Sequence, residues 1–191
     1  NLDANLREEM RFEIRRLHEA FGITTLYVTH DQAEAMVISD RIAVLHKGRV
    51  VQVGTAEELY QHPQNRFVAE FIGQTNLVDG VVAEPGVMTR GALRLRVASA
   101  DPSPGARVTV SIRPHQIQVV TDQTQRGENR FNGTVQRVSY LGDTVDYQVQ
   151  VAESDLILRV AAPPLLRLRP GEAVTLVVAP AACIPLSEGG E

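Results

Sequence analysis

The chain has few of the features that would tie it to an oxidising compartment, a membrane or a nucleic acid. Cys183 is the single cysteine among 191 residues, which excludes an internal disulfide and fits a reducing cytosol. No apolar run approaches the ~20 residues needed to span a bilayer, and no signal peptide is visible. With a net charge of −4, 5% aromatic residues and no basic stripe, we expect no nucleic-acid partner.

Two sequence elements of nucleotide hydrolysis are also missing. The pattern G-x-x-x-x-G-K-[ST], which cradles phosphates with backbone N–H groups, is absent, and the one lysine, Lys47, lies in a turn signal. No apolar strand ends in the Asp-Glu pair that would hold Mg²⁺ and polarise a water molecule. The sequence therefore predicts that these 191 residues do not hydrolyse ATP by themselves, and it predicts no metal site within them.

Residues 4–21 predict an amphipathic helix, with Gly22 as its end. Its charged residues, Arg11 and Arg15 among them, are interpreted as a solvated surface. Apolar residues recur on one face at spacings of three and four: Leu6, Met10, Ile14, Leu17 and Phe21.

A β-prone run at residues 23–28 predicts a buried strand that ends in Thr-His-Asp, with helix formers following it. In open α/β sheets the carboxyl end of a strand is where ligands bind, and His30 lies there. The alternative is a surface histidine that happens to follow a strand. Asp31 and Glu34 have the spacing of a capping box, so Glu34 is interpreted as a helix cap rather than a catalytic carboxylate.

Residues 41–46 and 49–53 predict a β-hairpin joined by Lys47 and Gly48. Thr55 and Glu58 form a second capping box, which opens a helix through about Gln61, and residues 66–72 predict another short helix.

After Gly73 the helical periodicity ends, and short β-prone runs alternate with Gly, Pro, Asp and Ser clusters. This spacing predicts a small all-β barrel or sandwich, with a domain boundary at residues 74–76. We therefore divide the chain into residues 1–75 and residues 76–191. The candidate strands are residues 77–83, 93–97, 107–113, 133–140, 145–151, 157–160 and 174–178.

Several segments resemble the ATP-binding-cassette (ABC) importer ATPases. Residues 27–36, YVTHDQAEAM, resemble the switch-histidine segment of that family, and residues 1–4, NLDA, resemble its D-loop. Residues 40–45 and 48–54 look like the closing strands of the nucleotide-binding domain. Residues 57–60, Pro63 and residues 67–73 look like the exit helices of importer ATPases that carry a regulatory β-domain.

The β-rich part resembles the regulatory β-domain of the same importers, known as the TOBE (transport-associated OB) domain. Residues 111–115, SIRPH, resemble its recurring I-R-P-E segment, with His115 in place of the usual acid, and residues 140–143, YLGD, resemble a second landmark. On their own, Arg113-Pro114 could be a strand ending at a proline, and Gly142-Asp143 could be a hairpin turn.

The resemblance implies an α/β remnant of a P-loop ATPase domain, followed by an all-β OB-like (TOBE) barrel or sandwich. It implies that His30 contacts the ATP γ-phosphate as the switch histidine, and that Asp3 joins two nucleotide sites across an ATPase dimer. As a residue at a helix start, Asp3 could equally be an N-cap. The missing elements would lie before Asn1, so we expect a chain that starts at the D-loop of a longer ATPase.

The parent implied by the resemblance is the ATP- and Mg-dependent subunit of a bacterial ABC importer. Its partners would be a second copy of itself, two transmembrane permease subunits and a solute-binding protein, at the cytoplasmic face of the plasma membrane. Residues 72–77 and Gly80 favour a polyamine or ferric-iron importer over a sugar importer. The alternative is a module of regulation, dimerisation or small-ligand sensing, carried by residues 76–185.

Overall fold

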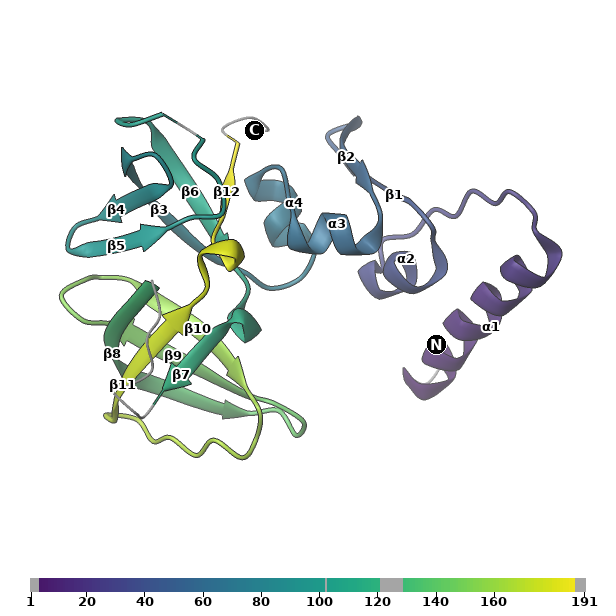
Figure 1. Cartoon of the computed structure of the whole chain (residues 1–191). Coiled ribbons are helices and arrows are strands. Elements are labelled where there is room, and N and C mark those ends of the chain that lie inside the picture. Colours follow the sequence, from purple (N-terminus) through teal and green to yellow (C-terminus); the bar gives the residue numbers. More distant parts are fainter. Residues whose placement is uncertain (1–3, 102, 121–128, 188–191) are drawn as a thin grey trace.

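A computed structural model of the chain describes residues 4–101, 103–120 and 129–187 (Figure 1). Helices and a single hairpin make up the described part before residue 76, and strands dominate after it. The elements before residue 76 are α1 (Ala4–Phe21), α2 (Gln32–Ile38), β1 (Ile42–His46), β2 (Arg49–Gly54), α3 (Ala56–Gln61) and α4 (Arg66–Phe71).

The predicted strand at residues 23–28 does not form. These residues are extended but belong to no sheet, and the side chains of Leu26 and Val28 are 91% and 89% exposed. A strand needs a neighbour for its N–H and C=O groups, and no described strand lies beside this run. The expectation of a buried strand at residues 23–28 is therefore wrong for the described residues.

Helix α1 lies at the opposite end of the molecule from the strands of residues 76–186 (Figure 1). Its predicted apolar face is largely uncovered. It ends, as predicted, at Gly22, whose φ of 62° is accessible to glycine at little cost. Leu6, Met10, Leu17 and Phe21 on that face remain exposed. The sequence therefore forms the helix, but the described chain supplies little to bury against it.

The local start and stop signals around the hairpin act as predicted. The β1–β2 turn has φ of 49° at Lys47 and 76° at Gly48, as a two-residue type I′ turn requires. Thr55 and Glu58 form a complete capping box at α3, in which each side chain accepts from the other's backbone N–H. The hairpin and the two short helices enclose a small core of Ile42, Val44, Leu59, Val68 and Ile72.

The β region, defined here as residues 76–186, contains two five-stranded antiparallel sheets, ordered β12-β6-β3-β4-β5 and β10-β9-β8-β11-β7. The second sheet curls until its edge strands β7 and β10 touch. The elements are β3 (Asn76–Glu84), β4 (Val87–Arg90), β5 (Leu93–Arg96), β6 (Arg107–Ile112), η1 (Pro114–Gln116), β7 (Ile117–Val120), β8 (Asn129–Tyr140), β9 (Val145–Val151), β10 (Ile157–Ala162), β11 (Ala173–Val178), η2 (Pro180–Ala182) and β12 (Ile184–Leu186).

All seven predicted strands of this region are present, as β3, β5, β6, β8, β9, β10 and β11. The prediction missed β4, β7 and β12, which are three or four residues long and lie beside prolines or tight turns. The all-β expectation is therefore confirmed for the described residues, with a more complex strand arrangement than the sequence revealed.

The β region consists of two halves with the same order of elements. The first half runs from β3 through η1 to β7, and the second half runs from β8 through η2 to β12. The first four strands of each half pair in the same order, as β6-β3-β4-β5 in the first half and β11-β8-β9-β10 in the second. The last strand of each half pairs in the sheet of the other half, as β7 with β11 and β12 with β6. Each half therefore exchanges one strand with the other.

The register of the strands confirms the equivalence of the two halves. Asn76 is paired with Ile112 in the first half, as Asn129 is with Val178 in the second. The ladder of each long strand shifts register directly after a valine, Val82 or Val135.

Two asparagine side chains join the halves reciprocally. The amide of Asn76 accepts from the backbone N–H of Arg159 at 2.7 Å and donates to the carbonyl of the same residue at 2.8 Å. The amide of Asn129 does the same with Arg96, at 2.6 and 2.7 Å. Each amide thus acts as one extra peptide unit on an edge strand of the other half, which satisfies groups that would otherwise be buried without a partner.

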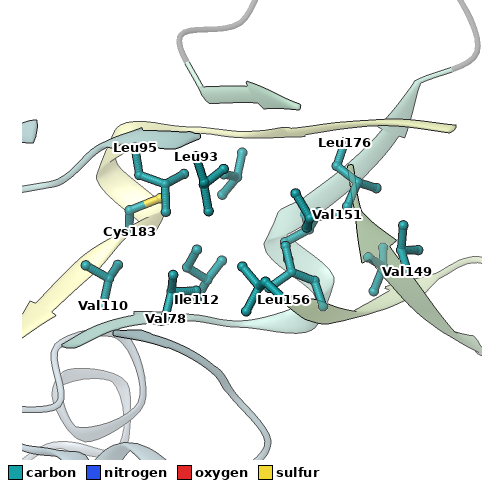
Figure 2. Packing of buried hydrophobic residues seen from close by; sticks show 14 of the residues in the cluster. Val78, Leu93, Leu95, Val110, Ile112, Val149, Val151, Leu156, Leu176 and Cys183 are labelled. Carbon is teal, nitrogen blue, oxygen red and sulfur yellow. The ribbon is translucent and has the colours of Figure 1, made fainter. Parts of the chain in front are cut away.

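One continuous core fills the space between the two sheets (Figure 2). Val78, Leu95 and Ile112 from the first half and Val151 and Leu176 from the second point into the same interior. Tyr147 is almost fully buried and donates its hydroxyl proton to the carbonyl of Leu166. No described helix is long and apolar enough to cross a membrane.

Candidate functional site: the His30 turn

His30 lies in the tight bend between the extended run and α2, and its side chain is exposed. The residue directly after it, Asp31, is the N-cap of α2 and has extended backbone angles. The sequence therefore predicted the position of the histidine correctly with respect to the helix. The structure differs in what precedes the bend, which is an unpaired segment in place of a strand.

A network of short hydrogen bonds fixes the backbone on both sides of His30. The hydroxyl of Thr29 donates to the carboxylate of Glu34 at 2.6 Å and accepts from the backbone N–H of Asp31 at 3.0 Å. The hydroxyl of Tyr27 donates to the same carboxylate at 3.1 Å. The hydrogen bond to Glu34 also raises the pKa of Tyr27. Glu34 therefore ties the residues before His30 to the helix after it.

The predicted capping box at α2 is only half correct. The Asp31 carboxylate accepts from the backbone N–H groups of Ala33 at 2.9 Å and Glu34 at 3.2 Å, as an N-cap should. The Glu34 side chain does not return to the N-cap backbone, because Thr29 and Tyr27 occupy it. The interpretation of Glu34 as a cap is thus wrong, and its side chain instead holds the His30 turn.

Two arginines of α1 hold this turn and α2 in place. Arg11 forms an ion pair with Asp31 at 3.0 Å, and Arg15 donates to the carboxylate of Asp40 at 2.7 Å and to the carbonyl of Ile38 at 3.1 Å. The backbone N–H of Glu34 and the charge of Arg11 together lower the pKa of Asp31. The prediction that these arginines only face solvent is wrong, because both bind groups of α2 or of the residues that flank it.

Asp3, the other predicted site residue, lies outside the described residues. Its two roles, as an N-cap of α1 and as a D-loop residue, therefore stay predictions.

The two landmarks of the β region fall at element ends. Ile112 ends β6, Arg113 follows it, and Pro114 opens η1. Gly142, with φ of 96°, lies in the turn between β8 and β9. The readings of these segments as a strand end at a proline and as a hairpin turn are both confirmed.

A shallow cleft includes the first residue of α2, Gln32. Its lining residues come from α2, from the segment that leads into β3, and from β10: Gln32, Glu70, Gly73, Gln74, Thr75 and Arg159. The guanidinium of Arg159 is already engaged by Asp146, at 2.6 and 3.3 Å. The helix that follows His30 therefore comes near the β region across this cleft.

Comparison with known proteins finds a matching domain family and similar import ATP-binding proteins. A family model described as the TOBE domain matches residues 110–186. The chain is 40% identical over 185 residues to the spermidine/putrescine import ATP-binding protein PotA of Rubrobacter xylanophilus, covering 92% of this chain and 48% of that protein. The chain is thus similar to import ATP-binding proteins over most of its own length, and its residues 110–186 match the TOBE domain.

Two further relatives are also described as import ATP-binding proteins. PotA 1 of Pseudomonas aeruginosa is 40% identical, with 93% of this chain and 49% of the relative covered. The Fe(3+) ions import ATP-binding protein FbpC 1 of Pectobacterium atrosepticum is 37% identical, with 98% and 52% covered. The chain thus spans about half the length of the curated relatives it matches.

A solved structure supports the fold of the TOBE-containing region. The cytoplasmic molybdate-binding protein ModG aligns with a TM-score of 0.52 at 16% sequence identity, covering 58% of this chain and 94% of ModG. At this identity the likeness concerns the fold alone. It agrees with a curled, OB-like β architecture for the β region of this chain.

Proposed function

We propose that the chain is the C-terminal part of the ATP-hydrolysing subunit of a bacterial ABC importer. In this proposal residues 1–75 complete a P-loop nucleotide-binding domain, and residues 76–191 are its TOBE regulatory domain. The observation that carries it is the His30 turn, held between α1 and α2 within a chain homologous to importer ATP-binding proteins. The exposed apolar run beside it, at residues 23–28, fits a strand whose sheet partners belong to the rest of that domain.

His30 would act as the switch histidine of the nucleotide site. A hydrogen-bond donor near the γ-phosphate stabilises the charge that develops during phosphoryl transfer, and a fixed donor does so with little reorganisation. Glu34, Thr29 and Asp31 supply that fixation, because they bond to each other across the bend. Asp3 would contribute from the D-loop to the contact between two ATPase copies.

Most of the groups that would hold ATP and Mg²⁺ are not in this sequence. The chain lacks a G-x-x-x-x-G-K-[ST] loop and an apolar strand ending in Asp-Glu. His30 would therefore supply one contact to a nucleotide held by the remainder of the subunit, and no tight ATP binding is expected from the 191 residues alone.

Phosphate release by the purified 191-residue chain with Mg·ATP tests whether this chain lacks a complete nucleotide site. We expect no turnover above background, because the phosphate cradle is missing. Turnover that disappears in His30→Ala would contradict the proposal, since the chain would then contain a complete site.

The partners of the whole subunit would be a second copy, two transmembrane permease subunits and a solute-binding protein at the inner face of the plasma membrane. The names of the relatives favour polyamine or ferric-iron uptake, because PotA is described as a spermidine/putrescine importer protein and FbpC as an Fe(3+) importer protein. Transport assays with a polyamine and with ferric iron would separate these two substrate classes.

A further inference from the structure

Arg113 is a buried arginine at the boundary between the helices and the β region. It follows the last residue of β6, and only 3% of it is exposed. Its side chain leaves the β region and reaches the ends of α3 and α4. It donates hydrogen bonds to residues that lie outside the His30 turn, namely Tyr60, Ala69, Gly73 and Gln74.

The guanidinium donates to backbone carbonyls from three consecutive parts of the chain. Nε and Nη2 both donate to the carbonyl of Tyr60, at 3.1 and 2.9 Å, and Nη1 donates to the carbonyl of Ala69 at 3.0 Å. Nη1 also reaches the carbonyls of Gly73 at 3.3 Å and Gln74 at 3.1 Å. One side chain of the β region therefore binds α3, α4 and the segment that leads into β3.

These carbonyls suit a cation. The carbonyls of Tyr60 and Ala69 belong to the last turns of α3 and α4, where they have no partner within the helix and carry partial negative charge. A planar guanidinium with five N–H donors can bind several of them at once, whereas the compact ammonium of lysine cannot span the same spread. Burial among neutral carbonyls lowers the pKa of Arg113, and arginine remains charged at neutral pH despite such a shift.

Close packing around Tyr60 completes the contact. The Arg113 guanidinium lies 4.2 Å from the centre of the Tyr60 ring, and the ring of His115 is stacked against the same tyrosine. A side chain at Gly73 would meet the Tyr60 ring at 3.1 Å, and φ there is 81°. The chain therefore passes closely over the tyrosine that Arg113 holds.

The repeat within the β region shows that its fold does not require this arginine. Arg113 is followed by Pro114 and η1 in the first half, and the equivalent position before Pro180 and η2 in the second half is Ala179. The same strand end and the same 3₁₀ turn thus form with an alanine. The arginine is present in the half that faces α3 and α4.

We propose that Arg113 is the joint that fixes the β region to α3 and α4, so that the β region and these two helices move as one rigid body. The joint lies wholly within this chain and is independent of ATP hydrolysis, so it goes beyond the proposed activity. Three weaker contacts assist it. Ser187 donates its backbone N–H to the carbonyl of Gln64 at 3.0 Å, exposed Arg66 lies 3.5 Å from Asp79, and the Tyr60 hydroxyl lies 3.3 Å from Nδ1 of His115. None of the three reaches both helices, whereas Arg113 binds both α3 and α4.

Spin labels on α3 and on β8 test the joint in the 191-residue chain. Glu57→Cys and Gln136→Cys are exposed sites, and buried Cys183, whose pKa is raised to about 12 by burial, leaves the added thiols as the reactive ones. We expect a single narrow distance distribution in the parent chain and loss of that narrow peak in Arg113→Met. Arg137→Met, a change at an exposed arginine of β8, is the matched control and should keep the narrow peak.

Arg113→Lys is the second variant and keeps the test informative if Arg113→Met folds poorly. One ammonium cannot reach all the carbonyls, so we expect a distribution broader than in the parent chain, while the thermal unfolding midpoint of the β core stays unchanged. A residue that only adds stability would lower the midpoint without broadening the distribution. A narrow peak in both Arg113 variants would overturn the proposal.

Discussion

Residues 4–30 and the β region respond differently to the same kind of sequence signal. Both contain apolar residues in clear periodic patterns, but in the β region these side chains form a closed core, whereas Leu26, Val28 and Phe21 stay exposed. In the β region, every strand of the two five-stranded sheets is paired with another strand of the same region. An apolar pattern therefore predicts that a surface is to be covered, and the covering partner has to be found separately.

The largest contrast between the two regions should appear when one leucine is truncated in each. Leu158 is 1% exposed in the shared core, so Leu158→Ala should lower the free energy of unfolding by about 2–5 kcal/mol. Leu26→Ala, at an exposed position, should change it by less than about 0.5 kcal/mol. Urea unfolding followed by circular dichroism measures both, and equal losses would remove the contrast.

A smaller effect should follow from removing either reciprocal asparagine. Asn76→Ala and Asn129→Ala each leave an edge-strand N–H and C=O of the other half without their buried partner. We expect a loss of about 1–3 kcal/mol in each variant, because unsatisfied buried polar groups keep their desolvation cost. The same urea titration checks this, and a loss in only one variant would argue against the equivalence of the two halves.

The smallest effect should be a pH dependence of the contact between α1 and α2. The pKa of Asp31 is lowered in the folded chain, so its contribution is present above the ordinary aspartate pKa of about 3.9 and is lost as the pH falls below it. Amide exchange in α2 should therefore accelerate below about pH 4 relative to the β core. Asp31→Asn should remove most of this dependence, and an unchanged acid response would assign it to other groups.

Local signals were the most predictable part of this chain. The hairpin turn at Lys47-Gly48, the capping box of Thr55 and Glu58, and seven strands of the β region follow from residues that are close in sequence. The short strands β4, β7 and β12 could not be predicted this way, because they depend on partners far along the chain.

The position of the His30 turn was predicted from the sequence, but the hydrogen bonds that hold the turn were not. His30 was found from its place after an apolar run, whereas the bonds of Glu34 to Thr29 and Tyr27 join residues of different elements and have no local pattern. One available signal was missed. The pattern N-x-x-x-G-x-V occurs at residues 76–82 and again at residues 129–135, and it marks the two equivalent long strands.

ATP turnover of the longer ATPase subunit proposed above, with His30→Ala compared with His62→Ala, tests the central claim most directly. His62 is an exposed histidine that follows α3 and serves as the matched control. We predict that His30→Ala lowers phosphate release by about 10²-fold or more, as expected for loss of a fixed donor to the transferring phosphate, while His62→Ala leaves it unchanged. Equal turnover in both variants would contradict the assignment of the His30 turn to the nucleotide site.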